Sequence, residues 1–186
     1  MRRDFGGNIE DWQSLFEAKT QLWNGSITCG SFKRKLAEML PGRRMTKIIC
    51  FGLGEMARQP PPTTLLPGQN GANVEVLSHS AARPPAMIQH AAALTLAEEV
   101  RRHCDGEVRL LAQDPQYSDD TKQCLQAKGF EVVGEFGGDG FAHIDDECTV
   151  FSAWPSAPIK QIIADIALPV ALIMVSDQCD SFNRFK

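Results

Sequence analysis

The first group of residues suited to binding or catalysis lies in one glycine-containing stretch. Ile48 to Phe51 is a short apolar run without helical period, which is typical of a central strand in a parallel sheet. Gly52 and Gly54 follow it, and Glu55 comes next. A Gly-x-Gly pair lets the backbone turn tightly and approach a ligand, as in dinucleotide-binding folds. The third glycine of that fingerprint is absent, so the stretch predicts either a nucleotide-type site or a strand that ends in a turn.

A carboxylate and two aromatic rings follow two later strands of the predicted sheet. Asp114 stands where an acid in dinucleotide-binding folds accepts hydrogen bonds from ribose hydroxyls, and its alternative role is a turn carboxylate before Pro115. Tyr117 and Trp154 could wall an adenine or another flat ligand, although Trp154 could equally belong to the core. The strand ends expected to converge at one edge of the sheet are Gly52 to Glu55, Gln113 to Tyr117 and Ser152 to Pro155.

Other candidate chemistry is sparse. Gln89 and His90 fall in the first turn of a predicted helix and could face the same edge, where His90 would be a general base or only a solvated group. Residues 78–80 place serine beside histidine, but no nucleophile elbow surrounds them. The acids at 145–147 could hold a cation, or form a solvated turn. We therefore assign no catalytic residue and no metal site.

Composition limits the class of protein. With 186 residues, 43% of them hydrophobic and 23% charged, the chain is most simply one soluble domain. A net charge of -4 argues against a nucleic-acid partner. The six cysteines form no Cys-x-x-Cys pair, so the zinc and thioredoxin signatures are absent. Cys50, Cys124 and Cys148 lie among apolar residues, which predicts core thiols in a reducing compartment. No secretory signal and no membrane-length apolar run is present, so we expect a cytoplasmic or nuclear protein without a membrane partner.

Hydrophobic periodicity predicts alternating strands and helices. That order predicts a Rossmann-like three-layer α/β domain with a mostly parallel sheet of about five strands and N-terminal helices packed alongside. The connection over residues 134–147 is expected to lack a full helix and to hold a glycine loop at 137–140. The predicted helices are 8–24, 31–40 with Ser31 as cap, 86–103, 118–128 and 158–166, and the predicted strands are 48–51, 108–112, 130–133, 148–151 and 169–175.

The chain divides into three predicted parts. Residues 1–42 form a helical segment packed on the main domain, with binding of a protein partner as the alternative role of its Trp and Phe side chains. Residues 43–176 form the main domain, and 177–186 form a tail. Within the main domain, the insert at 59–85 is rich in Pro, Gly, Ser and Thr. It is either a lid over the site or a disordered insertion, and a brief strand at 74–77 could interrupt it.

An ordered set of motifs carries a resemblance to a known family. The pieces are Ile48-Ile-Cys-Phe-Gly-Leu-Gly54, Gln89-His-Ala-Ala-Ala-Leu94, Asp114-Pro-Gln-Tyr-Ser118, Leu125-Gln-Ala-Lys-Gly-Phe130 and Thr149-Val-Phe151 with Pro155. Together they resemble the SRR-like (sensitivity to red light reduced) domain family in its fungal form, over about residues 46–175. The resemblance implies a Rossmann-like domain near methyltransferases that use S-adenosylmethionine (SAM). It also implies relatives linked to the circadian clock, light signalling, haem synthesis and microtubule stability.

The chain departs from that family in two places. Many members carry Pro-His-Cys after the fourth strand, where this chain has Trp154-Pro155-Ser156-Ala157, so any metal or catalytic role of that His and Cys is in doubt here. The insert at 59–85 is also longer than the usual connection. We expect a regulatory protein with a small nucleotide-type ligand, and a SAM-dependent methyltransferase is the alternative. The cofactor is otherwise unknown.

Overall fold

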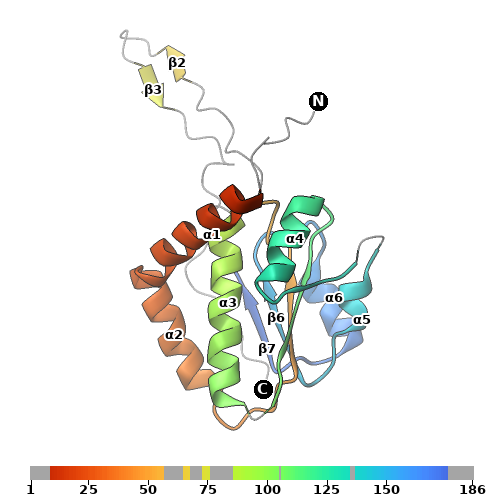
Figure 1. The fold of residues 1–186 in the computed structure, drawn as a ribbon. Coiled ribbons are helices and arrows are strands. Elements are labelled where there is room, and N and C mark those ends of the chain that lie inside the picture. The colour runs from red at the N-terminus through yellow and green to blue at the C-terminus, as the bar shows by residue number, and fades with distance from the viewer. Residues whose placement is uncertain are drawn as a thin grey trace.

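A computed structural model describes residues 9–56, 65–67, 73–75, 86–104, 106–134 and 137–175. Its centre is a sheet of five parallel strands in the order β5-β4-β1-β6-β7 (Figure 1). β1 (Lys47–Phe51) pairs with β4 (Arg109–Gln113) on one side and with β6 (Cys148–Ser152) on the other. β5 (Glu131–Val132) and β7 (Ala171–Met174) form the two outer strands. The predicted three-layer α/β fold is confirmed.

The helices cover both faces of this sheet. α3 (Ala86–His103) connects β1 to β4, α4 (Asp119–Ala127) connects β4 to β5, and α6 (Ile159–Ile166) connects β6 to β7. Among the described residues between β5 and β6, the one helix is the short α5 (Asp139–Ala142), so the prediction that this connection lacks a full helix is confirmed. The loop predicted at 137–140 is wrong in its second half, because α5 begins there. Figure 1 shows α1, α2 and α3 on one side of the sheet and α5 and α6 on the other.

The central strand contributes to two separate cores. Ile48 and Cys50 point into the core built with α1 to α4, whereas Ile49 and Phe51 point into the core built with α6 and the segment around α5. Successive side chains of a strand point to opposite faces, so a strand between two helical layers must be apolar at every position. This explains why the run has no helical period. The buried Cys50 thiol has its pKa raised by desolvation, which fits a core role.

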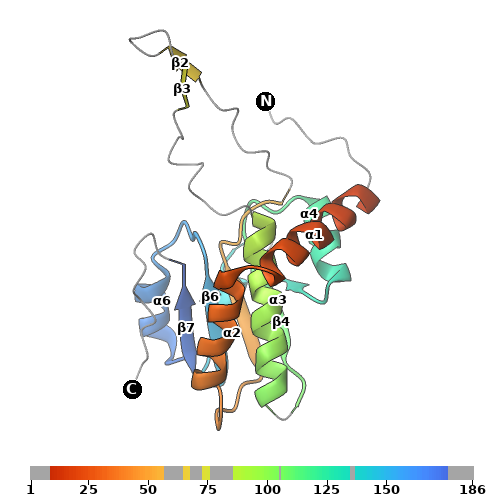
Figure 2. The same ribbon diagram turned by 90° about the vertical axis from the view of Figure 1, so that its left-hand side faces the viewer.

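The N-terminal helices are part of the domain core. In α1 (Ile9–Asn24) Phe16 is only 1% exposed, and in α2 (Ile27–Met39) Leu36 is fully buried. The Trp23 Nε1–H donates to Thr95 Oγ1 of α3 at 2.9 Å, and the Phe32 ring lies 6.5 Å from that of Phe151. Figure 2 shows both helices beside α3. These aromatic side chains therefore pack on the main domain, and their role in binding a protein partner stays a prediction.

The start of α2 corrects the sequence prediction. The helix begins at Ile27, and Ser26 is its N-cap, with the Ser26 side chain accepting a hydrogen bond from the Cys29 N–H at 3.1 Å. Ser31 lies inside the helix, where its hydroxyl accepts from Arg34. Both serines have a suitable cap composition. The one closer to Gly25, which follows α1, performs the role because the two helices are joined by a tight turn.

Only two short pieces of the insert are described. β2 (Leu65–Pro67) and β3 (Asn73–Glu75) form an antiparallel pair, and β3 overlaps the brief strand predicted at 74–77. The rest of the predicted insert at 59–85, with the serine and histidine at 78–80, lies outside the described residues, as does the tail at 177–186. Its role as a lid stays a prediction. Among the described helices, none has the length and apolar character to cross a membrane.

Candidate functional site

The glycine turn is built for close contact within the protein. Gly52 and Gly54 have φ of 66° and 83°, in the left-handed region that favours glycine. A Cβ on Gly52 would lie 2.7 Å from backbone atoms of Pro155, and the Trp154 N–H donates to the Gly52 carbonyl at 3.0 Å. The turn therefore holds the segment after β6 directly against the end of β1. We call residues 52–56, 113–118 and 152–155 the C-terminal edge.

Asp114 ties two loops of the C-terminal edge together. Its Oδ2 accepts a hydrogen bond from the Gly54 N–H at 2.8 Å, and its Oδ1 accepts from the Gln116 N–H at 2.9 Å. Both oxygens are thus used by the chain's own backbone. The turn-carboxylate interpretation accounts for both contacts. These contacts do not test ribose binding by Asp114, which stays a prediction.

Glu55 links the same turn to the start of α4. Its Oε2 accepts from the Ser118 N–H at 2.6 Å, and its Oε1 accepts from the hydroxyls of Ser118 at 3.0 Å and of Thr121. Ser118 is the N-cap of α4, as predicted, and its Oγ accepts from the Thr121 N–H at 3.2 Å. Because a helix N-terminus favours negative charge, Glu55 stabilises α4 from a distant part of the chain.

His90 lies inside the domain. Its side chain is 0% exposed, and Nδ1 lies 2.7 Å from the Ala86 carbonyl oxygen, which can only accept, so Nδ1 carries the proton. Nε2 then accepts from the Tyr117 hydroxyl at 2.9 Å. Burial lowers the His90 pKa from 6.5 to about 4, and burial likewise raises the Tyr117 pKa. A neutral imidazole with both nitrogens engaged does not fit the general-base role considered for it.

Six of the seven candidate residues lie together at or below the C-terminal edge, and the seventh, Gln89, lies in the first turn of α3. Hydrogen bonds join Gly54, Glu55, Asp114 and Tyr117 to neighbouring groups at or below the C-terminal edge, and Gly52 touches the backbone beside Trp154. Tyr117 is buried and bonded to His90, so it does not form an open wall for a flat ligand. Gln89 is buried, and the Trp154 ring is half-buried and packs against the core cluster shared by α1 to α4.

Sequence reasoning missed one organising residue, Gln113. Its Oε1 accepts from the Gly140 N–H at 2.7 Å, and its Nε2 donates to the Gly137 carbonyl. A Cβ on Gly134 or Gly140 would lie 2.5 Å or 2.3 Å from the Gln113 side chain. The signal was present as a glycine-rich loop at 134–140 together with a glutamine at a strand end. Only the pairing of β4 with β5 brings the two together.

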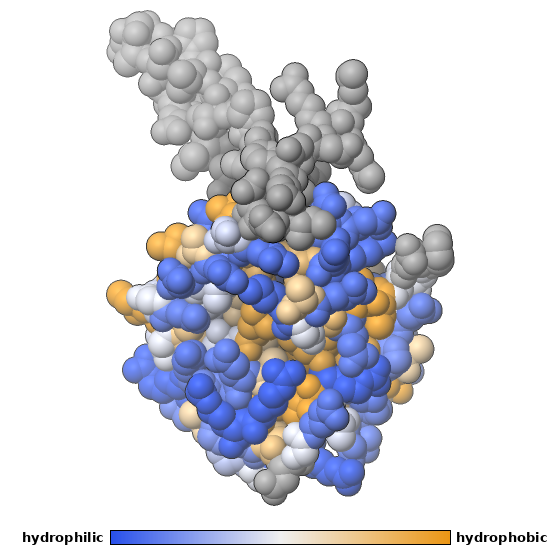
Figure 3. Space-filling model, in the orientation of Figure 1, coloured by the Kyte–Doolittle hydropathy of each residue, from blue (hydrophilic) through white to orange (hydrophobic). Residues whose placement is uncertain are grey.

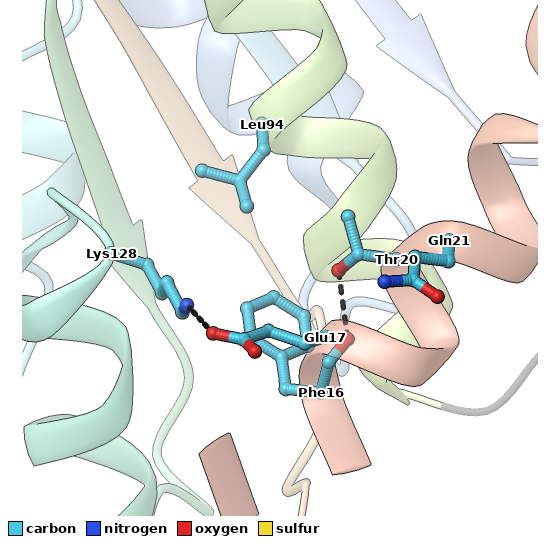
Figure 4. A pocket seen from close by; sticks show the side chains of 6 residues that line it. All are labelled: Phe16, Glu17, Thr20, Gln21, Leu94 and Lys128. Atoms are coloured by element: carbon cyan, nitrogen blue, oxygen red, sulfur yellow. Dashed lines mark hydrogen bonds and ion pairs between the residues drawn. The ribbon is translucent and has the colours of Figure 1, made fainter. Parts of the chain in front are cut away.

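A cavity of about 310 Å³ lies between α1, α3 and the end of α4 (Figure 4). Four of its six lining residues belong to α1. Across it, the Glu17 carboxylate pairs with the Lys128 ammonium at 2.7 Å. None of the predicted site residues lines this cavity. Its lining residues are Phe16, Glu17, Thr20, Gln21, Leu94 and Lys128.

The described residues contain no group of three or more His, Cys, Asp or Glu side chains placed to hold a metal ion. In the acidic stretch at 145–147, Asp145 pairs with Lys47 at 2.6 Å and Glu147 pairs with Arg44 at 3.2 Å. These acids belong to ion pairs at the end of the sheet opposite the glycine turn.

Figure 3 shows hydrophobic residues scattered among hydrophilic ones on the visible face. The most exposed large apolar side chain described is Ile27, at 91%.

Of three comparisons with known proteins, one finds a match to the chain. Neither the curated proteins nor the solved structures contain a match to the chain. The model of the SRR1 domain matches residues 31–179, which include all five strands of the parallel sheet and the whole C-terminal edge. α1 lies outside the matched range. Because the match covers most of the sequence, the chain belongs to the SRR1 domain family.

Proposed function

We propose that this SRR1-domain protein is a regulatory protein that binds a small nucleotide-type ligand at its C-terminal edge without acid–base catalysis. The observation that carries the proposal is that hydrogen bonds hold the C-terminal edge together. Asp114 joins the loops after β1 and β4, and Glu55 joins the loop after β1 to α4. Open α/β sheets bind ligands beyond the carboxyl ends of their strands. An edge held rigid before binding loses less entropy when the ligand arrives.

The protonation states support binding over turnover. A general acid or base needs a pKa near the working pH and a free lone pair or proton facing the substrate. His90 is neutral and shielded, and the pKa of Tyr117 is raised further from neutrality. The carboxylates of Glu55 and Asp114 accept hydrogen bonds from groups of the chain itself. These residues fit the role of scaffold for a binding surface.

The family suggests where such a protein acts. By analogy with relatives in circadian and light signalling and in the regulation of haem synthesis, ligand occupancy would alter how this chain affects a pathway. We propose a cytoplasmic or nuclear location and a protein partner, with no nucleic-acid or membrane partner. Expressing a fluorescent fusion and recovering its bound proteins would test both. Stable association with nucleic acid or with membranes would contradict this part of the proposal.

Calorimetry and thermal shift with SAM, S-adenosylhomocysteine, NAD, NADP, ATP and haem test ligand binding. A ligand at about one hundred times its dissociation constant adds about 2.7 kcal/mol to stability, a shift that is easily measured. Trp154→Leu removes the half-buried ring of the C-terminal edge while keeping an apolar side chain. Its matched control is Trp23→Leu, since Trp23 is also half-buried and packs on the same core.

The proposal expects one saturable ligand whose affinity falls in Trp154→Leu and is unchanged in Trp23→Leu. The ligand recovered after incubation with the protein should be chemically unchanged. Steady conversion of SAM that depends on residues of the edge would replace the proposal with the methyltransferase alternative. Silence across the panel, together with failure of adenosine to bind, would contradict a nucleotide-type ligand.

A further inference from the structure

The backbone N–H groups of the glycine turn, which a phosphate would need, already donate hydrogen bonds within the protein. Phosphate-binding turns present free backbone N–H groups to the anion. Here the Gly52 N–H donates to the Gln113 carbonyl at 3.2 Å, and the Gly54 N–H donates to Asp114 Oδ2 at 2.8 Å. The donor at Gly54 thus faces a carboxylate that belongs to the chain itself. An entering phosphate would have to displace it.

The nearest helix N-terminus is occupied in the same way. The first N–H groups of a helix attract anions. At the start of α4, the Ser118 N–H donates to Glu55 and the Thr121 N–H donates to the Ser118 hydroxyl. Glu55 therefore stands where a phosphate would gain most from the helix.

Space is also lacking against the turn. Any atom placed on the Cβ position of Gly52 would lie 2.7 Å from the Pro155 backbone and 2.8 Å from the Trp154 carbonyl carbon. In a dinucleotide site the lack of a side chain on such a glycine admits the pyrophosphate. Here the same lack admits a neighbouring segment of the protein. The described C-terminal edge, residues 52–56, 113–118 and 152–155, contains Glu55 and Asp114 and no lysine or arginine.

We infer that the C-terminal edge selects against phosphorylated ligands and takes an uncharged or cationic group beside the glycine turn. The inference rests on the proposed function and narrows its ligand to a nucleoside-type molecule without phosphate at that position. Because the described residues of the C-terminal edge carry two carboxylates and no lysine or arginine, repulsion should weaken a phosphorylated ligand by at least about tenfold against a matched cationic one.

The test compares 5′-amino-5′-deoxyadenosine with adenosine 5′-monophosphate by calorimetry on the full chain. The two probes share the base and sugar and differ in charge. Wild type should bind the amine at least about tenfold more tightly, and the ratio should shrink at high salt because ions screen exposed charges. Glu55→Gln keeps the size and most of the hydrogen bonds and should narrow the ratio by about threefold or more.

Glu147→Gln is the control, since it removes the same charge beside the opposite end of the sheet. It should leave the ratio unchanged. The salt series needs no substitution, so the inference can be judged even if Glu55→Gln folds poorly. Equal or tighter binding of the monophosphate by wild type would overturn the inference and leave the proposed function standing. Failure of both probes, together with silence of the wider ligand panel, would overturn both.

Discussion

Removing one hydroxyl from the interior tests the hydrogen-bond network most sharply. Tyr117→Phe deletes the donor that His90 Nε2 faces at 2.9 Å, while Nδ1 keeps its bond to Ala86. His90 is fully buried, so its nitrogen acceptor loses its partner where water does not reach. An unsatisfied buried polar group costs about 1–3 kcal/mol, and we expect the free energy of unfolding to fall by about that amount.

Urea denaturation at neutral pH measures the change, and an unaltered slope with denaturant would show that the unfolded state is the same. Thr149→Val is the matched control, because Thr149 is equally buried but its hydroxyl donates to the Met45 thioether, a weak acceptor. Its cost should stay below about 1 kcal/mol.

A double-mutant cycle with His90→Leu isolates the interaction energy between the side chains of Tyr117 and His90. In the His90→Leu background, Tyr117→Phe should cost less by about 1–3 kcal/mol, because the hydroxyl no longer has its acceptor. Equal costs in both backgrounds, or a neutral Tyr117→Phe in wild type, would refute the assignment of this hydrogen bond as the one that fixes His90.

Three further predictions follow from the same structure. Because burial lowers the His90 pKa from 6.5 to about 4 in the folded protein, the unfolded chain binds that proton more readily. Its contribution should therefore be constant above about pH 6.5 and fall by up to about 3 kcal/mol as the pH drops to about 4. Denaturation across that range should show the slope, and a persisting slope in His90→Leu would assign it to other groups. Gly52→Ala should destabilise the fold by several kcal/mol more than Gly129→Ala, since both have positive φ but only Gly52 has backbone against its Cβ position. Similar melting temperatures for the two would contradict that contact. Glu131→Gln breaks an exposed ion pair with Arg109 and should change stability by less than about 1 kcal/mol, and a larger loss by denaturation would mean that the pair is not simply a surface one.

The fold was predictable because its signals are local. The apolar run of β1, the amphipathic α3 and the glycine stops each depend on residues close in sequence, and their alternation implies a parallel sheet. The start of α2 was misplaced because Ser26 and Ser31 carry the same capping chemistry. Local composition does not choose between two equivalent caps, whereas the tight turn that follows α1 selects Ser26.

The meeting of the strand ends at the C-terminal edge was predictable, but the contacts between their residues were not. Strand ends in a parallel sheet converge, so Gly54 and Asp114 could be expected together. Their hydrogen bond, and the contacts of Glu55 with Ser118 and Thr121, depend on the arrangement of loops about sixty residues apart in sequence. The inward direction of His90 likewise depends on Tyr117 and on the aromatic rings around it. Sequence spacing carries no signal for either.

The pH dependence of adenosine binding tests the central claim most directly. Adenosine has no charge to lose near neutrality, so any change in affinity must come from the protein. If the buried His90 and Tyr117 only support a binding surface, calorimetry should give a dissociation constant that is flat from about pH 5.5 to about pH 8. A step or a bell-shaped profile in that range would reveal a free titrating group at the edge and contradict the account.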